Sequence, residues 1–308
     1  MIAAAGALGV LALALAWPVP VVLAQARWPA RSPATALVVW QGIALGGGLA
    51  MIGSLLAFGA APAGSLLGAA SSLLPHLRAG PIPAVFGVMH LASLTLAIGL
   101  AVHLALNLAT TGIRAEGARR RQHRLVDLLG DPMPGAPGTR VLSHPLPIAY
   151  CVPGVRTATV LTDGLVDLLD DDELQAVLAH ERAHLDQFHH LVLLAFRAWH
   201  AALPWFPIAN RAERAVALLT EMLADDRARA AVGARALATA LVRVGTAGEP
   251  GAYADAGGVH PDRGMLEQRL ARLGPRPAPL PAWARIACWA GAIATAATPV
   301  IVLLAILT

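Results

Sequence analysis

Residues 170–190 read DDDELQAVLAHERAHLDQFHH, and this stretch predicts a helix that carries chemically active side chains. Asp170 can cap the helix, with Glu173 three residues later in a loose capping-box pattern. Apolar residues then recur at helical spacing, at Leu174, Val177, Leu178 and Leu185. The stretch therefore predicts an amphipathic helix, with its polar face free for function.

The polar face of this helix holds His180, Glu181 and His184. Residues i and i+4 share a helical face, so both imidazoles can bind one metal ion. Glu181 can reach a water on that metal and accept its proton, because zinc makes such a water acidic near neutral pH. This is the HExxH arrangement of metallopeptidases. A solvated helix face is the alternative, since the five-residue pattern also occurs by chance.

A second predicted helix, Asn210–Ala231, contains Glu221 and Asp225, again four residues apart on one face. Catalytic zinc has three protein ligands and an open position, so Glu221 is the candidate third ligand. Asp225 can accept a hydrogen bond from a ligand imidazole and fix its tautomer. An ordinary acidic surface is the alternative for this pair alone. Two histidines, a glutamate and an open position favour zinc over other metals.

The connection between the two helices must bend. The chain runs about 19 residues past His184, or about 29 Å if helical, whereas the return to Glu221 covers about 11 residues and about 17 Å. We therefore predict that the first helix breaks between Gln187 and His200. The apolar run Leu191–Leu203 is too short to span a bilayer and is expected to rest on its surface.

The composition is that of a membrane protein. Of 308 residues, 56% are hydrophobic and 14% are charged, whereas soluble proteins carry about 25% charged residues. All 19 acidic residues lie between Glu116 and Glu267, so apolar flanks surround one water-compatible domain. Acidic and basic residues nearly cancel within that domain, so the net charge of +4 does not indicate nucleic-acid binding.

Four apolar stretches are long enough to cross about 30 Å of hydrocarbon as helices; they are Ile2–Ala24, Thr35–Phe58, Pro83–Thr111 and Trp283–Leu307. They predict three spans and their loops over residues 1–113, a central domain over 114–281 and a fourth span over 282–308. Small residues at Gly42, Gly46 and Ala50 would allow close helix packing in the second span. The region Ala61–Leu77, interrupted by Pro and Gly, is expected to be a loop on or in the bilayer.

The basic residues predict the orientation. Five arginines follow the third span, two lie in the first loop, and only Arg78 lies in the second loop. The positive-inside rule then places the central domain in the cytoplasm and both termini outside. A cleaved signal peptide ending near Ala24-Gln25-Ala26 is the alternative, which the absence of a positive charge at the extreme N-terminus disfavours.

The central domain is expected to be mainly helical with a small β-sheet. Three short β-prone segments are separated by Pro and Gly; they are Val141–Leu142, Ile148–Val152 and Thr157–Leu161. An extended peptide substrate could add as a strand to an edge near Thr157–Leu161.

The motifs together resemble a known group. His180–His184, then an apolar run ending in Trp205-Phe206-Pro207, then Glu221 and Asp225 are similar to the BlaR/MecR-type integral membrane metallopeptidases. A looser similarity extends to the HtpX and CAAX-prenyl-protease group. The likeness covers most of the chain and is specific between about Ala149 and Ala228.

The resemblance implies a gluzincin-type endopeptidase in a bacterial cell membrane. It implies one zinc ion per chain, bound by His180, His184 and Glu221, with Glu181 as general base. In BlaR-type proteins the substrate is a cytoplasmic winged-helix repressor, which makes such a repressor and the lipid bilayer the expected partners. Those proteins continue into an extracellular penicillin-binding sensor domain, whereas this sequence stops at Thr308, so β-lactam sensing through such a domain is not expected.

Other histidines are weaker candidates. His260-Pro261 followed by Arg269 and Arg272 resembles a stretch in the HtpX group, in which His260 could donate to the oxyanion of the tetrahedral intermediate. A surface histidine beside two glycines is an equal alternative. His189 and His190 are not expected to act in the site, because zinc already has its ligands.

Three functions follow. The favoured hypothesis is regulatory cleavage of a repressor. The second is quality control of membrane proteins, as in the HtpX group. The third is a non-catalytic membrane receptor or scaffold with a decayed protease fold, which the intact His180, Glu181, His184 and Glu221 disfavour.

Overall fold

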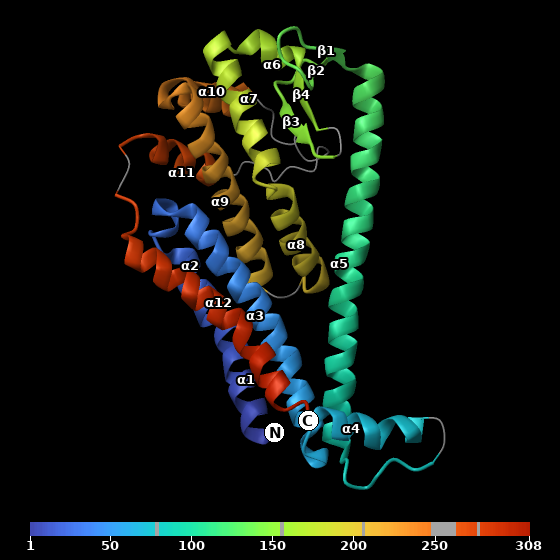
Figure 1. Ribbon diagram of the computed structural model, residues 1–308. Coiled ribbons are helices and arrows are strands. Elements are labelled where there is room, and N and C mark those ends of the chain that lie inside the picture. Colours follow the sequence, from blue (N-terminus) through green and yellow to red (C-terminus); the bar gives the residue numbers. More distant parts are fainter. Residues whose placement is uncertain (78–79, 155–156, 205–206, 248–262, 276–277) are drawn as a thin grey trace.

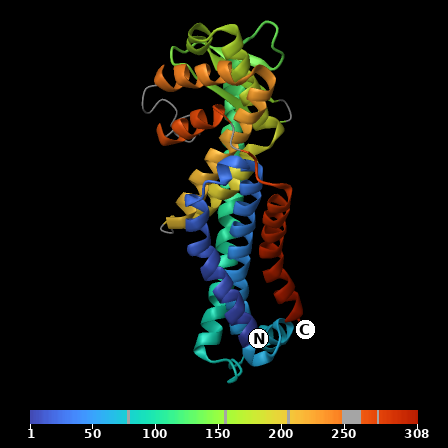
Figure 2. The same ribbon diagram turned by 90° about the vertical axis from the view of Figure 1, so that its left-hand side faces the viewer.

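The computed structural model describes residues 1–77, 80–154, 157–204, 207–247, 263–275 and 278–308. The described α-helices are α1 (Ile2–Ala16), α2 (Pro18–Gln25), α3 (Pro33–Gly59), α4 (Leu66–Leu73), α5 (Val88–Leu129), α6 (Asp163–Leu168), α7 (Asp171–Asp186), α8 (His189–Ala202), α9 (Pro207–Val232), α10 (Ala234–Ala247), α11 (Arg263–Leu273) and α12 (Ala282–Ala305). The described strands are β1 (Asp131–Pro132), β2 (Thr139–Leu142), β3 (Ala149–Val152) and β4 (Ala158–Thr162). The molecule is elongated, with a bundle of apolar helices at one end and the sheet with its helices at the other (Figures 1 and 2).

Four helical segments of the described chain are long and apolar enough to cross a membrane; they are Ile2–Gln25, Pro33–Gly59, Val88–Leu129 and Ala282–Ala305. They coincide with the four predicted apolar stretches, which supports a membrane protein. The first segment consists of α1 and α2, which meet at Trp17 because Pro18 cannot continue the hydrogen-bond ladder of the preceding helix. Both chain termini and α4 lie at the end of the bundle remote from the sheet (Figure 1).

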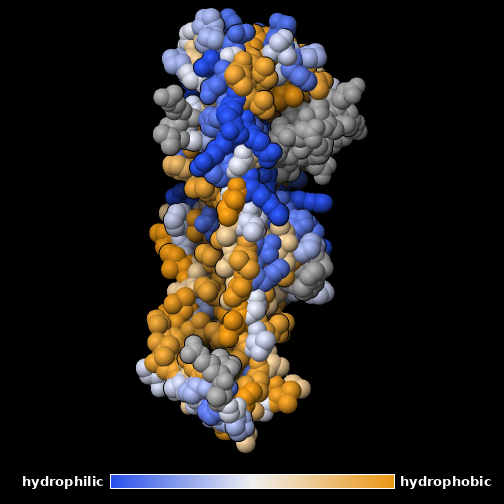
Figure 3. Space-filling view, turned by 90° about the vertical axis from the view of Figure 1, so that its right-hand side faces the viewer, coloured by the Kyte–Doolittle hydropathy of each residue, from blue (hydrophilic) through white to orange (hydrophobic). Residues whose placement is uncertain are grey.

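Helix α5 joins the two ends of the molecule without interruption. Its 42 residues cover about 63 Å, roughly twice the hydrocarbon thickness of a bilayer. It begins at Val88 rather than at Pro83, and it continues through the expected domain boundary at residue 113. On the face that Figure 3 shows, apolar residues dominate the lower part of the molecule and strongly hydrophilic residues gather above them.

The second span, α3, packs closely against the fourth, α12, because its residues at the contact are small. A Cβ added to Gly42 would lie 2.8 Å from the carbonyl oxygen of Ala292, and one added to Gly46 would lie 2.5 Å from that of Thr295. Real Cβ atoms essentially never come so near to backbone. The predicted close packing through these glycines is therefore present, between α3 and α12.

The region Ala61–Leu77 is more regular than the predicted loop. It forms a 3₁₀ turn at Ala61–Ala63, then α4, then a second 3₁₀ segment at Leu74–Leu77. Ser65 caps α4 by accepting from the backbone of Gly68, which explains why this Pro- and Gly-rich stretch contains a helix. The backbone N–H groups of residues 66 and 67 donate to the carbonyls of residues 306 and 307, so this segment is tied to the end of α12.

The predicted small sheet has four strands in the order β1-β2-β4-β3. Strand β4 is parallel to β2 and antiparallel to β3, so it is internal. The suggested substrate edge near Thr157–Leu161 is therefore wrong, because β4 already pairs on both sides. The edge that lies against α7 is β3, whose Cys151 thiol donates to the backbone carbonyl of Glu181 at 2.9 Å.

One hydrophobic core crosses from the apolar bundle into the helices of the domain. It joins side chains of α1, α2 and α3 with side chains of α8 and α9; its buried members are Leu15, Leu23, Ala36, Leu37, Trp40, Ile43, Phe196, Ala212, Val216 and Leu219. A second core under the sheet joins β4, α6, α7 and α10. The α8–α9 pair therefore folds against the membrane helices, and the sheet end has its own core.

The sequence suggested that the run Leu191–Leu203 rests on the bilayer surface. Helix α8, which contains most of this run, instead lies alongside α5 (Figure 1). Its last residue, Ala202, accepts a hydrogen bond from Nε2 of His103, which lies midway along the apolar part of α5. Near the same end, His200 Nδ1 lies 2.6 Å from Oε2 of Glu213 on α9. The tip of the α8–α9 pair thus reaches the level of the membrane spans.

Candidate metal centre

Helix α7 presents the central motif because its start is firmly specified. The predicted capping box is confirmed: Asp170 accepts from the backbone of Glu173 at 2.9 Å, and the Glu173 side chain accepts from the backbone of Asp170 at 3.1 Å. Leu174 and Leu178 are buried in the core under the sheet. With that face of the helix turned inward, His180 and His184 point toward α9.

The predicted break after the motif is also present. Helix α7 ends at Asp186, and Phe188 has a φ of 52°, in the left-handed region that bulky residues rarely adopt. Helix α8 then starts at His189 in a new direction. The break shortens the outward path, so that α9 can return to the level of α7 and present Glu221 there.

His180, His184 and Glu221 meet at one point. Their nearest ligand atoms lie within 4.8 Å of one another. The two Nε2 atoms are 3.1 Å apart, Nε2 of His180 lies 3.4 Å from a Glu221 oxygen, and Nε2 of His184 lies 3.3 Å from the other. The side chain of Glu221 is 27% exposed, so the cluster has an open side.

This spacing fits a tetrahedral metal. Zinc binds nitrogen and carboxylate oxygen at about 2.0–2.1 Å, and two ligands at that distance in a tetrahedron lie about 3.3 Å apart. The donor set of two imidazoles and one carboxylate with an open side is also that of catalytic zinc sites. The residues present therefore fit such an ion.

Asp225 and Arg269 contact the candidate ligands His180 and Glu221 and hold them in place. Asp225, 2% exposed, places Oδ1 2.9 Å from Nδ1 of His180. Arg269 on α11 donates from Nε and Nη2 to the two oxygens of Asp225 at 2.8 and 2.7 Å. Its Nη1 lies 2.9 Å from Oε2 of Glu221. One buried guanidinium therefore contacts both carboxylates, and Asp225 is placed to fix the tautomer of His180.

The electrostatics of the cluster favour bound positive charge. Burial by itself would raise the pKa of Glu221, but the Arg269 charge and the close contacts with His180 and His184 hold that pKa well below its usual range. Burial would lower the pKa of His180, but the nearby carboxylates of Asp225 and Glu221 outweigh it and raise that pKa. The carboxylates that favour a proton here also favour a metal cation.

Glu181 lies on the same helix between the two histidines and is half-buried. Burial would lower the pKa of Arg269, but the charges of Glu221, Asp225 and Glu181 raise it, so the Glu181 carboxylate lies within electrostatic range of the cluster. Burial, followed by the Glu181 charge, raises the pKa of the Cys151 thiol. Cys151 is therefore a neutral thiol that attaches β3 to α7, and it is not a nucleophile.

His189, which the sequence does not predict to act in the site, lies against His184. It is 2% exposed, and its Nδ1 lies 3.0 Å from Nδ1 of His184. Its Nε2 lies 3.2 Å from Oε1 of Gln187. Burial and the nearby His184 lower the pKa of His189 to about 4, so it is neutral at physiological pH. His190, its neighbour, makes no contact of this kind with the cluster within the described residues.

The other predicted site residue, His260, lies outside the described residues. The sequence relates Arg269 only to a similar stretch in the HtpX group, and the segment around Arg269 does not predict its contacts. The available signal is general: an arginine on an otherwise amphipathic helix such as α11 is buried only when it is paired.

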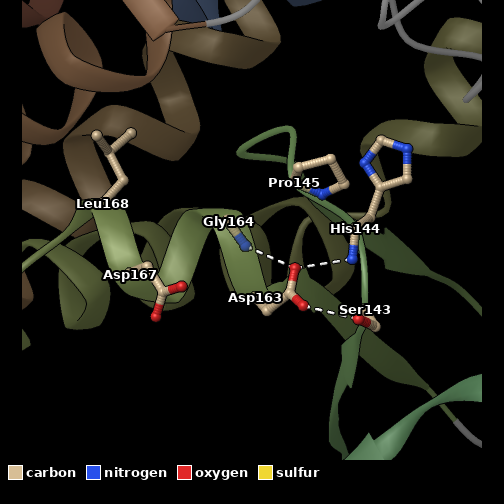
Figure 4. A pocket seen from close by; sticks show the side chains of 7 residues that line it. All are labelled: Ser143, His144, Pro145, Asp163, Gly164, Asp167 and Leu168. Atoms are coloured by element: carbon tan, nitrogen blue, oxygen red, sulfur yellow. Dashed lines mark hydrogen bonds between the residues drawn. The ribbon is translucent and has the colours of Figure 1, made fainter.

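An open depression of about 530 Å³ lies elsewhere in the domain, between the end of β2 and α6. Figure 4 shows that the Asp163 carboxylate accepts hydrogen bonds from Ser143 Oγ and from the backbone N–H groups of His144 and Gly164. The His144 ring points away from that carboxylate and accepts instead from the backbone of Leu146. These contacts fix a turn, and they do not form a serine–histidine–aspartate relay.

Comparison with known proteins agrees with the geometry. Residues 114–261 match the model of peptidase family M48, a family of membrane-associated zinc metallopeptidases. The matched segment contains His180, His184 and Glu221. No curated protein and no solved structure matches the chain at a significant level.

Proposed function

We propose that the chain is a zinc endopeptidase built into a membrane, because residues 114–261 match the model of peptidase family M48 and four helical segments are apolar enough to cross a membrane. One observation carries the proposal. The Nε2 atoms of His180 and His184 are 3.1 Å apart, and each lies 3.3–3.4 Å from a different oxygen of the Glu221 carboxylate, which is close to the spacing of zinc ligands around a tetrahedron, and one side is open.

A zinc ion held by these residues supplies a Lewis acid that polarises the substrate carbonyl and lowers the pKa of a water beside it. Glu181 accepts the proton of the attacking water and delivers it to the leaving amine nitrogen. Asp225 keeps the Nδ1 of His180 as a donor, so that its Nε2 lone pair faces the metal. Arg269 keeps both carboxylates ionised within a buried site.

The substrate peptide adds to β3. This strand is at the edge of the sheet, and Cys151 on it contacts the backbone of Glu181. A peptide paired with β3 therefore runs past the metal helix with its backbone hydrogen-bonded, so that any unfolded segment is accepted and side-chain pockets set the preference.

For the substrate we propose a cytoplasmic or membrane-associated protein, with regulatory cleavage of a winged-helix repressor as the leading case. Quality control of membrane proteins is the competing role. Either role requires the central domain to lie in the cytoplasm, and we propose that the two chain termini lie outside. The arginines that follow the third span support this orientation, since they lie at the sheet end of the molecule.

The test is proteolysis by the purified protein beside Glu181→Gln. Both proteins are incubated with a candidate repressor and with an unfolded membrane protein, and zinc content is measured in parallel. We expect about one zinc in each protein and cleavage by the wild type alone. Cleavage of the repressor only would favour the regulatory role, and cleavage of the unfolded protein only would favour quality control.

Two results would contradict the proposal. A wild-type protein without metal would remove the metal centre. Zinc-loaded wild type that leaves every substrate intact would favour the non-catalytic receptor or scaffold. The orientation is tested separately, by fusing a reporter active only in the cytoplasm to the loop between β1 and β2; an inactive reporter would reverse the assignment.

A further inference from the structure

His189 touches the metal face without contributing to any chemistry described so far. We propose that His189 is a positioning residue, which accepts a hydrogen bond from Nδ1 of His184 and thereby directs the Nε2 lone pair of His184 at the metal. The inference rests on the proposed function, because it concerns how the same metal face is held.

The hydrogen bonds decide the direction of donation. Oε1 of Gln187 has no hydrogen to give, so Nε2 of His189, 3.2 Å away, is the donor to it. In the tautomer with its proton on Nε2, the imidazole of His189 has its lone pair on Nδ1, which is therefore an acceptor. The group 3.0 Å from that acceptor is Nδ1 of His184, which must therefore donate. His184 then carries its lone pair on Nε2, the atom that faces Glu221 at 3.3 Å.

The helix break makes this contact possible. On a continuous helix, residues five apart point about 140° away from each other, so His184 and His189 could not meet. The left-handed Phe188 turns the chain back, and the two rings stand edge to face with centroids 4.8 Å apart. The unusual backbone of Phe188 thus has a use, which is to return His189 to the end of α7.

The two histidine ligands are held by different kinds of acceptor. His180 faces the charged carboxylate of Asp225, whereas His184 faces a neutral ring. Within the described residues, this face already holds the carboxylates of Glu221, Asp225 and Glu181, and Arg269 is the cation that pairs with the first two. A neutral acceptor fixes the second imidazole without adding negative charge, which keeps the bound metal a stronger Lewis acid than a further carboxylate would.

The experiment compares three variants with the wild type. His189→Phe keeps a buried ring and removes the acceptor. His189→Asn restores an oxygen at nearly the position of Nδ1. His190→Phe is the matched control, since it changes the adjacent histidine. Zinc affinity is measured by competition with a chelator, and the metal environment by the visible spectrum of the Co²⁺-substituted protein. Melting temperatures in excess chelator check that each variant folds.

We expect His189→Phe to bind zinc about 10- to 100-fold more weakly and to change the Co²⁺ spectrum. We expect His189→Asn and His190→Phe to stay near the wild type in both. Wild-type affinity in His189→Phe, or equal losses in the Phe and Asn variants of His189, would overturn the assignment. A wild-type protein without zinc would instead contradict the proposed function itself. This outcome is distinct from the outcomes that contradict the role of His189.

Discussion

Arg269 illustrates how single residues hold this site. Its guanidinium uses three nitrogens on two carboxylates, and its side chain is only 9% exposed. Two carboxylates and one guanidinium buried together are stable as a set, but each member depends on the others. Removing one partner from such a group leaves uncompensated buried charge, which costs far more than the intact group contributes.

We therefore predict that Arg269→Met destabilises the metal-free protein by about 3–5 kcal/mol. The matched control is Arg120→Met, which breaks an exposed pair with Glu116 and should change stability little, because solvent screens exposed pairs. Thermal unfolding in chelator measures both. Added zinc should recover part of the loss in Arg269→Met, because it neutralises the same carboxylates. Equal stability of the two variants would contradict the prediction.

Asp163 gives a pH dependence of known sign. The hydrogen bond from Ser143, with backbone N–H groups of His144 and Gly164, holds the pKa of Asp163 below its usual range. A lowered pKa contributes stability above the ordinary value of about 3.9, which is lost as pH falls through the lowered one. We expect Asp163→Asn to have a lower Tm at pH 7 and a shallower fall of Tm in acid than the wild type. An unchanged acid profile would show that this turn does not contribute.

At the scale of elements, α3 and α12 are in contact through glycine. We predict that Gly46→Leu destabilises the bundle by about 1–3 kcal/mol, because a side chain there meets the backbone of Thr295. Gly48→Leu is the control, since a Cβ at Gly48 meets nothing within 4 Å. Melting temperatures in detergent compare them. A similar fall in both would mean that glycine acts through helix propensity alone, not through the contact.

Elements with local signals could be predicted from the sequence. The start of α7 is specified by Asp170 and Glu173 within four residues, and the break at Phe188 follows from the lengths of two helices. Strand order could not be predicted, because β4 pairs with β2 across about 20 residues and nothing in its own composition shows that both of its edges are used. The role of Arg269 could not be predicted for the same reason, because its partner Asp225 is 44 residues away in the sequence.

The role of His189 could not be predicted from the sequence for a different reason. Its role depends on the direction of the chain after Phe188, and a ligand count for zinc stops at three residues. The pattern HERAHLDQFHH contains all the atoms of the arrangement, but only the broken helix brings Gln187 and His189 onto His184. Hydrogen bonds to ligands are set by backbone geometry that residue spacing does not specify.

At the scale of the whole molecule, the position along α5 where charged residues begin indicates how far the site lies from the bilayer. No Asp, Glu, Lys or Arg occurs on it before Arg114. The charge of Arg119, five residues farther on, acts with burial to lower the pKa of His190 beside the metal face. Five helical residues cover about 8 Å. The start of α8 beside the metal helix thus lies on the charged side of Arg114, and we expect the metal face on the order of 10 Å beyond that residue.

A substrate anchored by its own membrane helix must cross that gap. About three extended residues span about 10 Å. We predict that an anchored substrate with no spacer before its scissile bond is resistant, and that cleavage begins once the spacer reaches about three to six residues. Gel analysis of a spacer series in liposomes measures this, with a soluble version of the same peptide as control. Cleavage without a spacer would contradict the depth.

The hydrophobic core shared by α3, α8 and α9 has one more consequence. The end of α8 at Ala202 lies beside the middle of the apolar part of α5, the opposite end of α8 carries His189, and the middle of α9 carries Glu221. A bilayer that thickens or thins shifts apolar helices relative to its surface at a cost of fractions of a kcal/mol per ångström. We therefore expect the lipid composition of the host membrane to act on the helices that shape the metal face, which would make bilayer thickness a physical variable of the proposed catalysis.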